Sequence, residues 1–248
     1  MTGRSAPVQY SAVTLRACPF EVRHELAGWT LLWVLLELVS AEEAAKPANP
    51  DALAELRRRA AERARARHGL GELPADATIG AVRRLFRAAG CDPTRYRPSS
   101  EALLRRLLKG EELPVIQPLV DLCNCLSVGL AVPCGLAAEG SFEPPVRLRA
   151  GAPDEQFDSL RGPFPLAGKP LLADARGPLG TPITDGQRGK VLPQTRRAWL
   201  IVYLPAVPPA PQPDAALEAL AELLREAPVA RLRHAAVSRD AGAAAAPG

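Results

Sequence analysis

The sequence predicts an α+β fold, and two observations lead to this class. Helical patterns gather in residues 51–127, whereas short β-like runs separated by Gly and Pro follow from residue 128 onward. Helices gathered early and strands gathered late favour α+β over alternating βαβ units. The chain of 248 residues, 47% hydrophobic and 23% charged, is also large and apolar enough to bury a core without a disulfide or metal staple.

The first element expected is residues 29–39, a Leu- and Val-rich run that is either a buried strand or a short core helix. It contains Glu37 and has about half of the ~20 residues needed to cross a bilayer, so we expect no membrane partner. The chain opens without a cationic, apolar leader, and we therefore expect a cytoplasmic protein.

Four helices are expected next, ending at residue 127. Residues 51–68 and 76–89 have apolar residues at helical spacing, and Asp76 can cap the second. The third helix follows the good N-cap residues Ser99 and Ser100, buries the leucines of residues 103–108 and stops at Gly110. Residues 115–127 form the fourth, whose side chains at 117, 121 and 124 (Gln, Asp and Asn) share one polar stripe.

Strands are expected at residues 146–149, 171–175 and 199–203. The segment 205–213 is rich in proline and predicts an extended connector. Asp214 then caps a last amphipathic helix. We expect one domain over residues 1–234 and a disordered tail over residues 235–248.

The charge balance is mildly basic, since 31 Lys and Arg face 27 acids, and Arg supplies 27 of the 31. This balance is compatible with a nucleic-acid partner without proving one. The arginines of residues 51–68 form either a phosphate-binding face or a solvated surface of Glu–Arg pairs. Eleven aromatic residues argue against a base-stacking platform of the kind found in single-strand-binding proteins.

Five cysteines offer no metal site, because they lack paired Cys-x-x-Cys spacing and the three histidines are scattered. We expect reduced thiols packed as small hydrophobic groups. No phosphate loop, dinucleotide fingerprint or Gly-x-Ser-x-Gly elbow occurs in the sequence, and we expect no cofactor and no metal.

Three segments carry a resemblance to a known family: GCDPTRYRPSSEALLRRLLKGEELPVIQPLVDLCNCLSVGLAVPCG, VRLRAGAPDEQF and DGQRGKVLPQTRRAWLIVY. Their order and spacing resemble freestanding relatives of the tRNA-editing (B-three/B-four) domain of the phenylalanyl-tRNA synthetase β subunit. The resemblance covers residues 80–204 and implies a three-layer α+β sandwich. It also implies an activity, the hydrolysis of the ester that joins a wrong amino acid to tRNA. A second hydrolytic site is needed because a synthetic site rejects a near-isosteric side chain only ~10–200-fold.

The resemblance implies a pocket, with Asn124 as the catalytic residue that positions substrate or water. Cys123 stands where the synthetase domain has threonine, and Gly135 stands where it has histidine, which opens space. The floor corresponds to residues 181–186, where Asp185 replaces a glycine. The residue that reads the tyrosine hydroxyl falls near the apolar Ile201. The substrate-binding residues expected are Asp185, Cys123, Gly135, Thr181, Ile201 and Asp121.

Asp185 directs the expected specificity, because a half-buried carboxylate needs a cationic partner. Some freestanding members of the family deacylate tRNA that carries arginine analogues such as canavanine, so the resemblance implies a cationic substrate. Two alternatives stay open: Asp185 pairs internally with Arg188, or it caps a turn in TDGQ.

Three function classes follow. The first is a trans-editing deacylase, whose tRNA partner is held by Arg97, Arg105, Arg106 and Arg188; the first three could instead pair with Glu101 or Glu111. The second is a non-catalytic tRNA- or RNA-binding module on the same scaffold. The third is a hydrolase of free amino-acid esters, whose activity would not change with salt.

Overall fold

The computed structural model describes residues 14–39 and 51–240. The first half holds strands β1 (Arg16–Ala17), β2 (Val22–His24) and β3 (Trp29–Leu38), helix α1 (Ala52–Arg67), the 3-10 helix η1 (Leu73–Ala75), and helices α2 (Ala77–Ala88), α3 (Ser99–Leu108) and α4 (Pro118–Leu130). The second half holds β4 (Cys134–Ala138), β5 (Val146–Ala150), β6 (Gln156–Ser159), β7 (Gly162–Pro165), β8 (Pro170–Asp174), β9 (Gly177–Gly180), β10 (Arg197–Pro205), α5 (Pro213–Glu226) and β11 (Ala230–Arg239). The predicted α+β class is confirmed.

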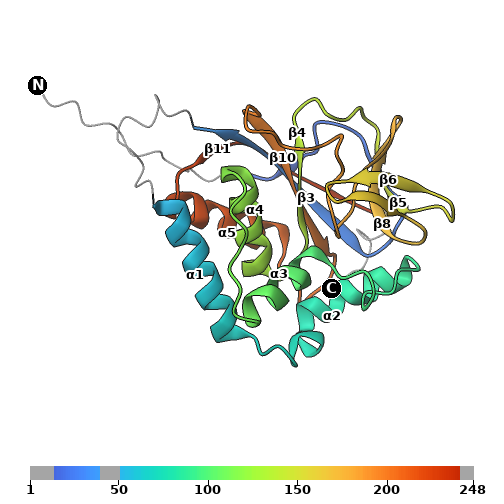
Figure 1. The fold of residues 1–248 in the computed structure, drawn as a ribbon. Coiled ribbons are helices and arrows are strands. Elements are labelled where there is room, and N and C mark those ends of the chain that lie inside the picture. The colour runs from blue at the N-terminus through green and yellow to red at the C-terminus, as the bar shows by residue number, and fades with distance from the viewer. Residues whose placement is uncertain (1–13, 40–50, 241–248) are drawn as a thin grey trace, which may run out of the picture.

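A five-stranded sheet in the order β1-β11-β3-β10-β4 lies in the middle of the molecule (Figure 1). The apolar run of residues 29–39 forms a strand, β3, whose residues Trp29 to Leu36 are all buried. A strand covered on both faces has such a nearly continuous apolar sequence, which Thr30 alone interrupts between Trp29 and Leu36. β10 pairs with β3 antiparallel from Arg197↔Glu37 to Pro205↔Trp29, and β4 is the outer strand on that side.

Helices cover one face of this sheet and a smaller sheet covers the other, giving the expected three layers (Figure 1). On the helical side α4 and α5 contact the strands, and α1 packs outside α4. The second sheet has the order β2-β5-β8-β9. Between the sheets, the Phe20 ring meets Trp33 edge to face at 5.1 Å and Trp199 at 5.2 Å. Such T-shaped contacts add to the area that the rings bury.

The helix boundaries agree with the sequence where a side chain caps the helix, and differ where proline or a tertiary contact intervenes. The Asp76 carboxylate accepts hydrogen bonds from the backbone of Thr78 and Ile79, as predicted. The predicted caps Ser99 and Ser100 are wrong: Pro98 is the N-cap, both serines lie inside the helix, and no side chain caps it. The fourth helix begins at Pro118, later than predicted, because proline favours the first helical turn.

The C-terminal part contains more structure than the sequence indicated. Residues 206–212 connect β10 to α5, and α5 begins at Pro213, so Asp214 lies in its first turn and is not its cap. Residues 235–239, expected in a disordered tail, belong to β11 and pair with β3. Alanine has a weak strand preference, but backbone pairing with a buried strand overrides it. Residues 241–248 lie outside the described residues.

Candidate functional site

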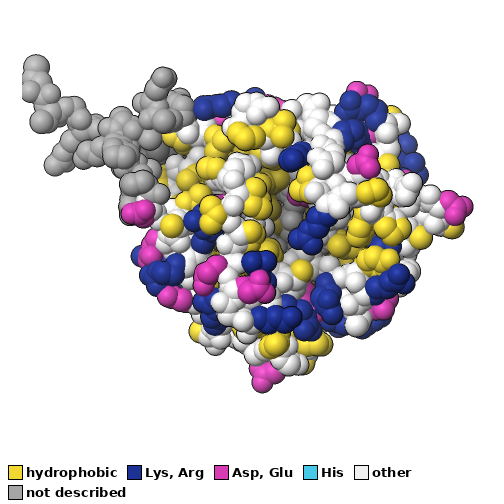
Figure 2. Space-filling model, in the orientation of Figure 1, with side chains coloured by type: hydrophobic (Ala, Val, Ile, Leu, Met, Phe, Trp, Pro, Cys, Tyr) yellow, Lys and Arg dark blue, Asp and Glu magenta, His cyan; other side chains and the backbone are white. Residues whose placement is uncertain are grey.

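A groove of about 850 Å³ opens on the side of the molecule where β4 is the outer strand. One wall comes from residues 95–97, α3 and the start of α4, and the opposite wall comes from the tip of the β6–β7 hairpin and from residues 181–185. The space-filling view shows a hollow in this face, with dark-blue cationic side chains around it (Figure 2). The volume lies within the range of small-molecule and cofactor sites.

The groove is basic. Its lining holds two carboxylates, Glu111 and Asp185, against six cationic side chains: Arg95, Arg97, Arg105, Arg106, Lys109 and Arg161. This excess of positive charge favours a polyanionic partner. Of the arginines that the sequence suggested, Arg97, Arg105 and Arg106 therefore lie together, as expected of one binding surface.

The alternative pairings of these arginines are also present. Arg105 Nε lies 3.0 Å from a Glu101 oxygen, and Arg106 Nη2 lies 3.1 Å from a Glu111 oxygen. Arg97 is exposed, and no carboxylate of the described chain pairs with it. Arg97 is thus the freer cation of the three, while Arg105 and Arg106 are held in position by their acids.

Asp185 is half-buried and lines the groove. Burial raises the pKa of its carboxyl to about 7, and a hydrogen bond from the Leu136 N–H of β4 acts in the opposite direction. Two residues along β4, the Ala138 N–H donates to the Gly189 carbonyl at 2.9 Å. The Asp185–Gly189 segment therefore runs along the open edge of the central sheet.

In the structure Asp185 neither pairs with Arg188 nor caps a turn in TDGQ, the two alternatives that the sequence left open. Arg188 pairs with Asp174, at 2.7 Å, and donates to the Gly177 carbonyl at 2.8 Å, so its expected pairing with Asp185 is wrong. The Asp174 side chain is fully buried. Leaving its charge unpaired would therefore cost more free energy than leaving Asp185, which is half-buried, without a cation. The turn before Asp185 is closed by Thr181, whose Oγ1 accepts from the N–H groups of residues 183 and 184. Within the described chain, no cation pairs with Asp185.

Gly135 makes room for Asp185, and the expectation that it opens space for substrate is wrong. A Cβ built on Gly135 would lie 2.8 Å from Asp185 Oδ1, closer than real Cβ contacts. Only a residue without a side chain lets the carboxylate approach the β4 backbone in this way. One oxygen of the Asp185 carboxylate therefore lies where a side chain at position 135 would begin.

Asn124 and Thr181 line the groove together with Asp185, as the sequence predicted. No protein group in the described residues hydrogen-bonds the Asn124 side-chain amide, which is therefore free to bind a ligand or water. Cys123 lies behind the wall, 6% exposed, and its thiol is hydrogen-bonded to that of Cys134. This bond and burial raise the pKa of Cys123 well above its usual range. Cys134 lines the groove in its place.

Besides Cys123 and Gly135, three further predicted site residues do not line the groove. Asp121 is 1% exposed and is paired with Arg57 of α1 at 2.6 Å, so it joins two helices. Ile201 is buried in β10, opposite Gly135, and Arg188 is held by Asp174. Helical and strand spacing correctly placed Asp121 and Ile201 on their elements, but could not show which neighbour each side chain faces.

The lining residues that the sequence analysis did not predict include one aromatic and three cationic side chains: Arg95, Tyr96, Lys109 and Arg161. The signal for the first two was the string TRYR, where cations alternate with one aromatic ring. Across residues 14–39 and 51–240, no group of three or more His, Cys, Asp or Glu side chains could hold a metal ion. The same residues include no helix of the length and apolarity that a membrane span requires.

Comparisons with known proteins identify the family of the domain that contains the groove. The family model described as the B3/4 domain matches residues 81–207, a range that contains every lining residue of the groove. Among the solved structures that match is an N-terminal fragment of the phenylalanyl-tRNA synthetase β-subunit from Pyrococcus horikoshii, with 12% identity and a TM-score of 0.42. The match covers 92% of this chain and 52% of the fragment, so the chain spans about half the fragment's length. The sequence matches no curated protein.

Proposed function

Because the chain belongs to the B3/4 domain family, we propose that it is a trans-editing deacylase that acts in the cytoplasm. It hydrolyses the ester bond of a mischarged aminoacyl-tRNA. The favoured substrate is a tRNA carrying a cationic non-cognate amino acid, such as the arginine analogue canavanine.

The observation that carries the proposal is the Asp185 carboxylate, half-buried in a groove of otherwise cationic character with no cation paired to it in the described chain. An unpaired buried carboxylate is costly, and a guanidinium-like side chain would satisfy it with two parallel hydrogen bonds. The cationic rim suits the phosphates of the RNA, and Asp185 suits the side chain of the esterified amino acid.

The remaining chemistry requires little from the protein, since an aminoacyl ester is already reactive. The Asn124 amide lines the same groove as Asp185 and supplies a donor for a water molecule or for the developing oxyanion. Thr181 fixes the turn that precedes Asp185. Arg97 is the first candidate for a phosphate contact, since its guanidinium is exposed and charged at every relevant pH.

A second candidate function is a non-catalytic tRNA- or RNA-binding module. It is favoured by Cys123, which is buried behind the wall where the resembled synthetase domain has a threonine, and by Gly135 in place of a histidine. Such a module would keep the basic rim and bind tRNA without shortening the lifetime of any aminoacyl ester.

The test is a deacylation panel across tRNAs charged with correct, incorrect and non-protein amino acids. We expect release of a cationic non-cognate amino acid faster than buffer hydrolysis. We also expect that Asp185→Asn loses that substrate far more than any neutral one, because it keeps the shape and removes the charge. Asp154→Asn, the same change at an exposed position, is the matched control. Binding of tRNA without acceleration on any substrate would favour the binding module.

A further inference from the structure

Lys169 is a buried cation with no acid to balance it, and it lies against Tyr96 at the groove. Its residue is 3% exposed, and its Nζ lies 3.7 Å from the centroid of the Tyr96 ring and 5.6 Å from that of Phe164. The carbonyl of Ala167, at 3.4 Å from Nζ, is its hydrogen-bond partner. Within the described residues no carboxylate pairs with this lysine, so the ring faces supply the compensating negative potential.

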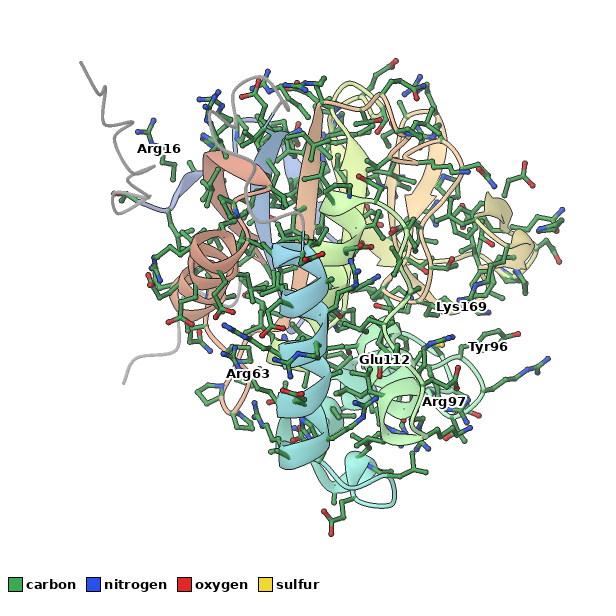
Figure 3. All side chains as sticks on the ribbon, turned by 60° about the vertical axis from the view of Figure 1, so that its left-hand side comes forward. Arg16, Arg63, Tyr96, Arg97, Glu112 and Lys169 are labelled. Carbon is green, nitrogen blue, oxygen red and sulfur yellow. The ribbon has the colours of Figure 1, made fainter. Side chains whose placement is uncertain are left out.

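The cation holds the Tyr96 ring in one orientation. Because Nζ covers one face of the ring, a ligand in the groove that Tyr96 lines has only the opposite face to stack on. Phe164 meets the ring edge to face, with centroids 5.9 Å apart and planes at 82°. Figure 3 shows Lys169, Tyr96 and Arg97 close together at the same end of the molecule. The ring is therefore positioned before any ligand binds, which lowers the entropy lost on binding.

Cations without a carboxylate partner lie at the same groove. Arg95 and Arg97 flank the ring in sequence, and the Arg95 guanidinium itself lies over the ring, 5.2 Å from its centroid. Arg161 lies at the opposite wall. In the described chain none of the three has a carboxylate partner. A basic groove with an aromatic face is the arrangement that binds single-stranded nucleic acid, because every unpaired base has a face to stack. Bases inside a duplex are not accessible to such a ring.

We infer that Tyr96 stacks on the unpaired terminal base of an RNA 3′ end while Arg97 and Arg161 contact the adjacent phosphates. This inference rests on the proposed tRNA substrate and names the part of it that the groove recognises. One ring accommodates one base, so the scarcity of aromatic residues in the sequence, which excludes an extended platform, leaves room for this contact.

The test measures three proteins, the wild type and two Tyr96 variants, against two RNAs by fluorescence anisotropy at one salt concentration. The probes are a labelled RNA hairpin with an unpaired 3′-ACCA end and the same hairpin with an abasic 3′ nucleotide. Stacking on an aromatic side chain changes affinity by about 5- to 150-fold per base, so the wild-type protein should bind the abasic probe weaker by about this factor. Tyr96→Leu should bind both probes equally, and Tyr96→Phe, which keeps the ring, should discriminate as the wild type does.

Comparing two probes on the same protein makes the cycle independent of any loss of folded protein in Tyr96→Leu. Equal affinity of the wild type for both probes, or unchanged discrimination in Tyr96→Leu, overturns the stacking inference. If that happens while the wild-type protein still deacylates a mischarged tRNA, the proposed function stands and the stacking inference alone fails. A wild-type protein that binds neither probe and deacylates no tRNA overturns both.

Discussion

Replacing Gly135 by alanine should displace the Asp185 carboxylate while leaving the fold almost as stable as before. The new Cβ would lie 2.8 Å from Asp185 Oδ1 and 3.8 Å from Tyr203 Cε2, so the carboxylate has to move by about half an ångström to reach ordinary contact. The clash is with the end of a side chain, so it costs about 1 kcal/mol. The lower entropy of an unfolded chain with alanine offsets ~0.4–1 kcal/mol of that cost.

The electrostatic effect should be larger than the effect on stability. Moving the carboxylate weakens its hydrogen bond with the Leu136 N–H, which acts to lower the pKa of Asp185. Complete loss of a hydrogen bond to a charged group, roughly 1.5–3 kcal/mol, would correspond to about one to two pH units. Because the displacement only weakens this bond, the pKa of Asp185, about 7 in the wild type, should rise in Gly135→Ala by less than that, as long as the carboxyl stays buried.

The assay is a carbon-13 NMR titration of the Asp carboxyl resonances in both proteins, with the Asp185→Asn spectrum to assign the signal. Thermal denaturation of the same samples checks that the fold is intact. Gly189→Ala is the comparison variant, since its Cβ would meet Leu179 Cδ1 at 3.2 Å and not Asp185. An Asp185 pKa in Gly135→Ala equal to that of the wild type would refute the packing argument, whatever the activity.

Four further predictions follow from the same contacts. Asn124→Ala should lower deacylation by ~10²–10³-fold at unchanged stability, because an oriented donor is lost; near wild-type turnover would remove Asn124 from the site. Arg97→Ala should reduce by about one the slope of log affinity for tRNA against log salt, whereas an unchanged slope would exclude a phosphate contact. Asp121→Asn breaks the buried pair with Arg57 and should cost ~3–5 kcal/mol in urea unfolding; a much smaller loss would mean that the pair is not what joins α1 to α4. Because the folded pKa of Asp185 is raised from 3.8 to about 7, the folded state binds the extra proton between these values. The unfolding free energy of the wild type relative to Asp185→Asn should thus fall by up to ~4 kcal/mol from about pH 4 to pH 8, and a difference independent of pH would contradict this.

The sequence was enough to predict those elements whose stability depends on interactions between residues close together in the chain. The helix after Asp76 is one of these elements. Its N-cap carboxylate bonds the backbone two and three residues later, and its apolar stripe follows from residues three and four apart. The α+β class followed from the order of helical and strand-like segments. The resemblance placed Asn124, Thr181 and Asp185, and these three line one groove.

Contacts between distant segments were decided only by the tertiary structure. Residues 29–39 could have been helix or strand until β10 and β11 paired with them on both sides. The pairing of Arg188 with Asp174 rather than Asp185 depends on which carboxylate the fold buries more completely, a quantity that no spacing encodes. The same holds for Gly135: the sequence determined that a side chain was missing, but the approach of the Asp185–Gly189 segment to the edge of β4 decided that a carboxylate fills the space. Burial and charge pairing are sums over neighbours from many parts of the chain, so they are fixed only once the chain has folded.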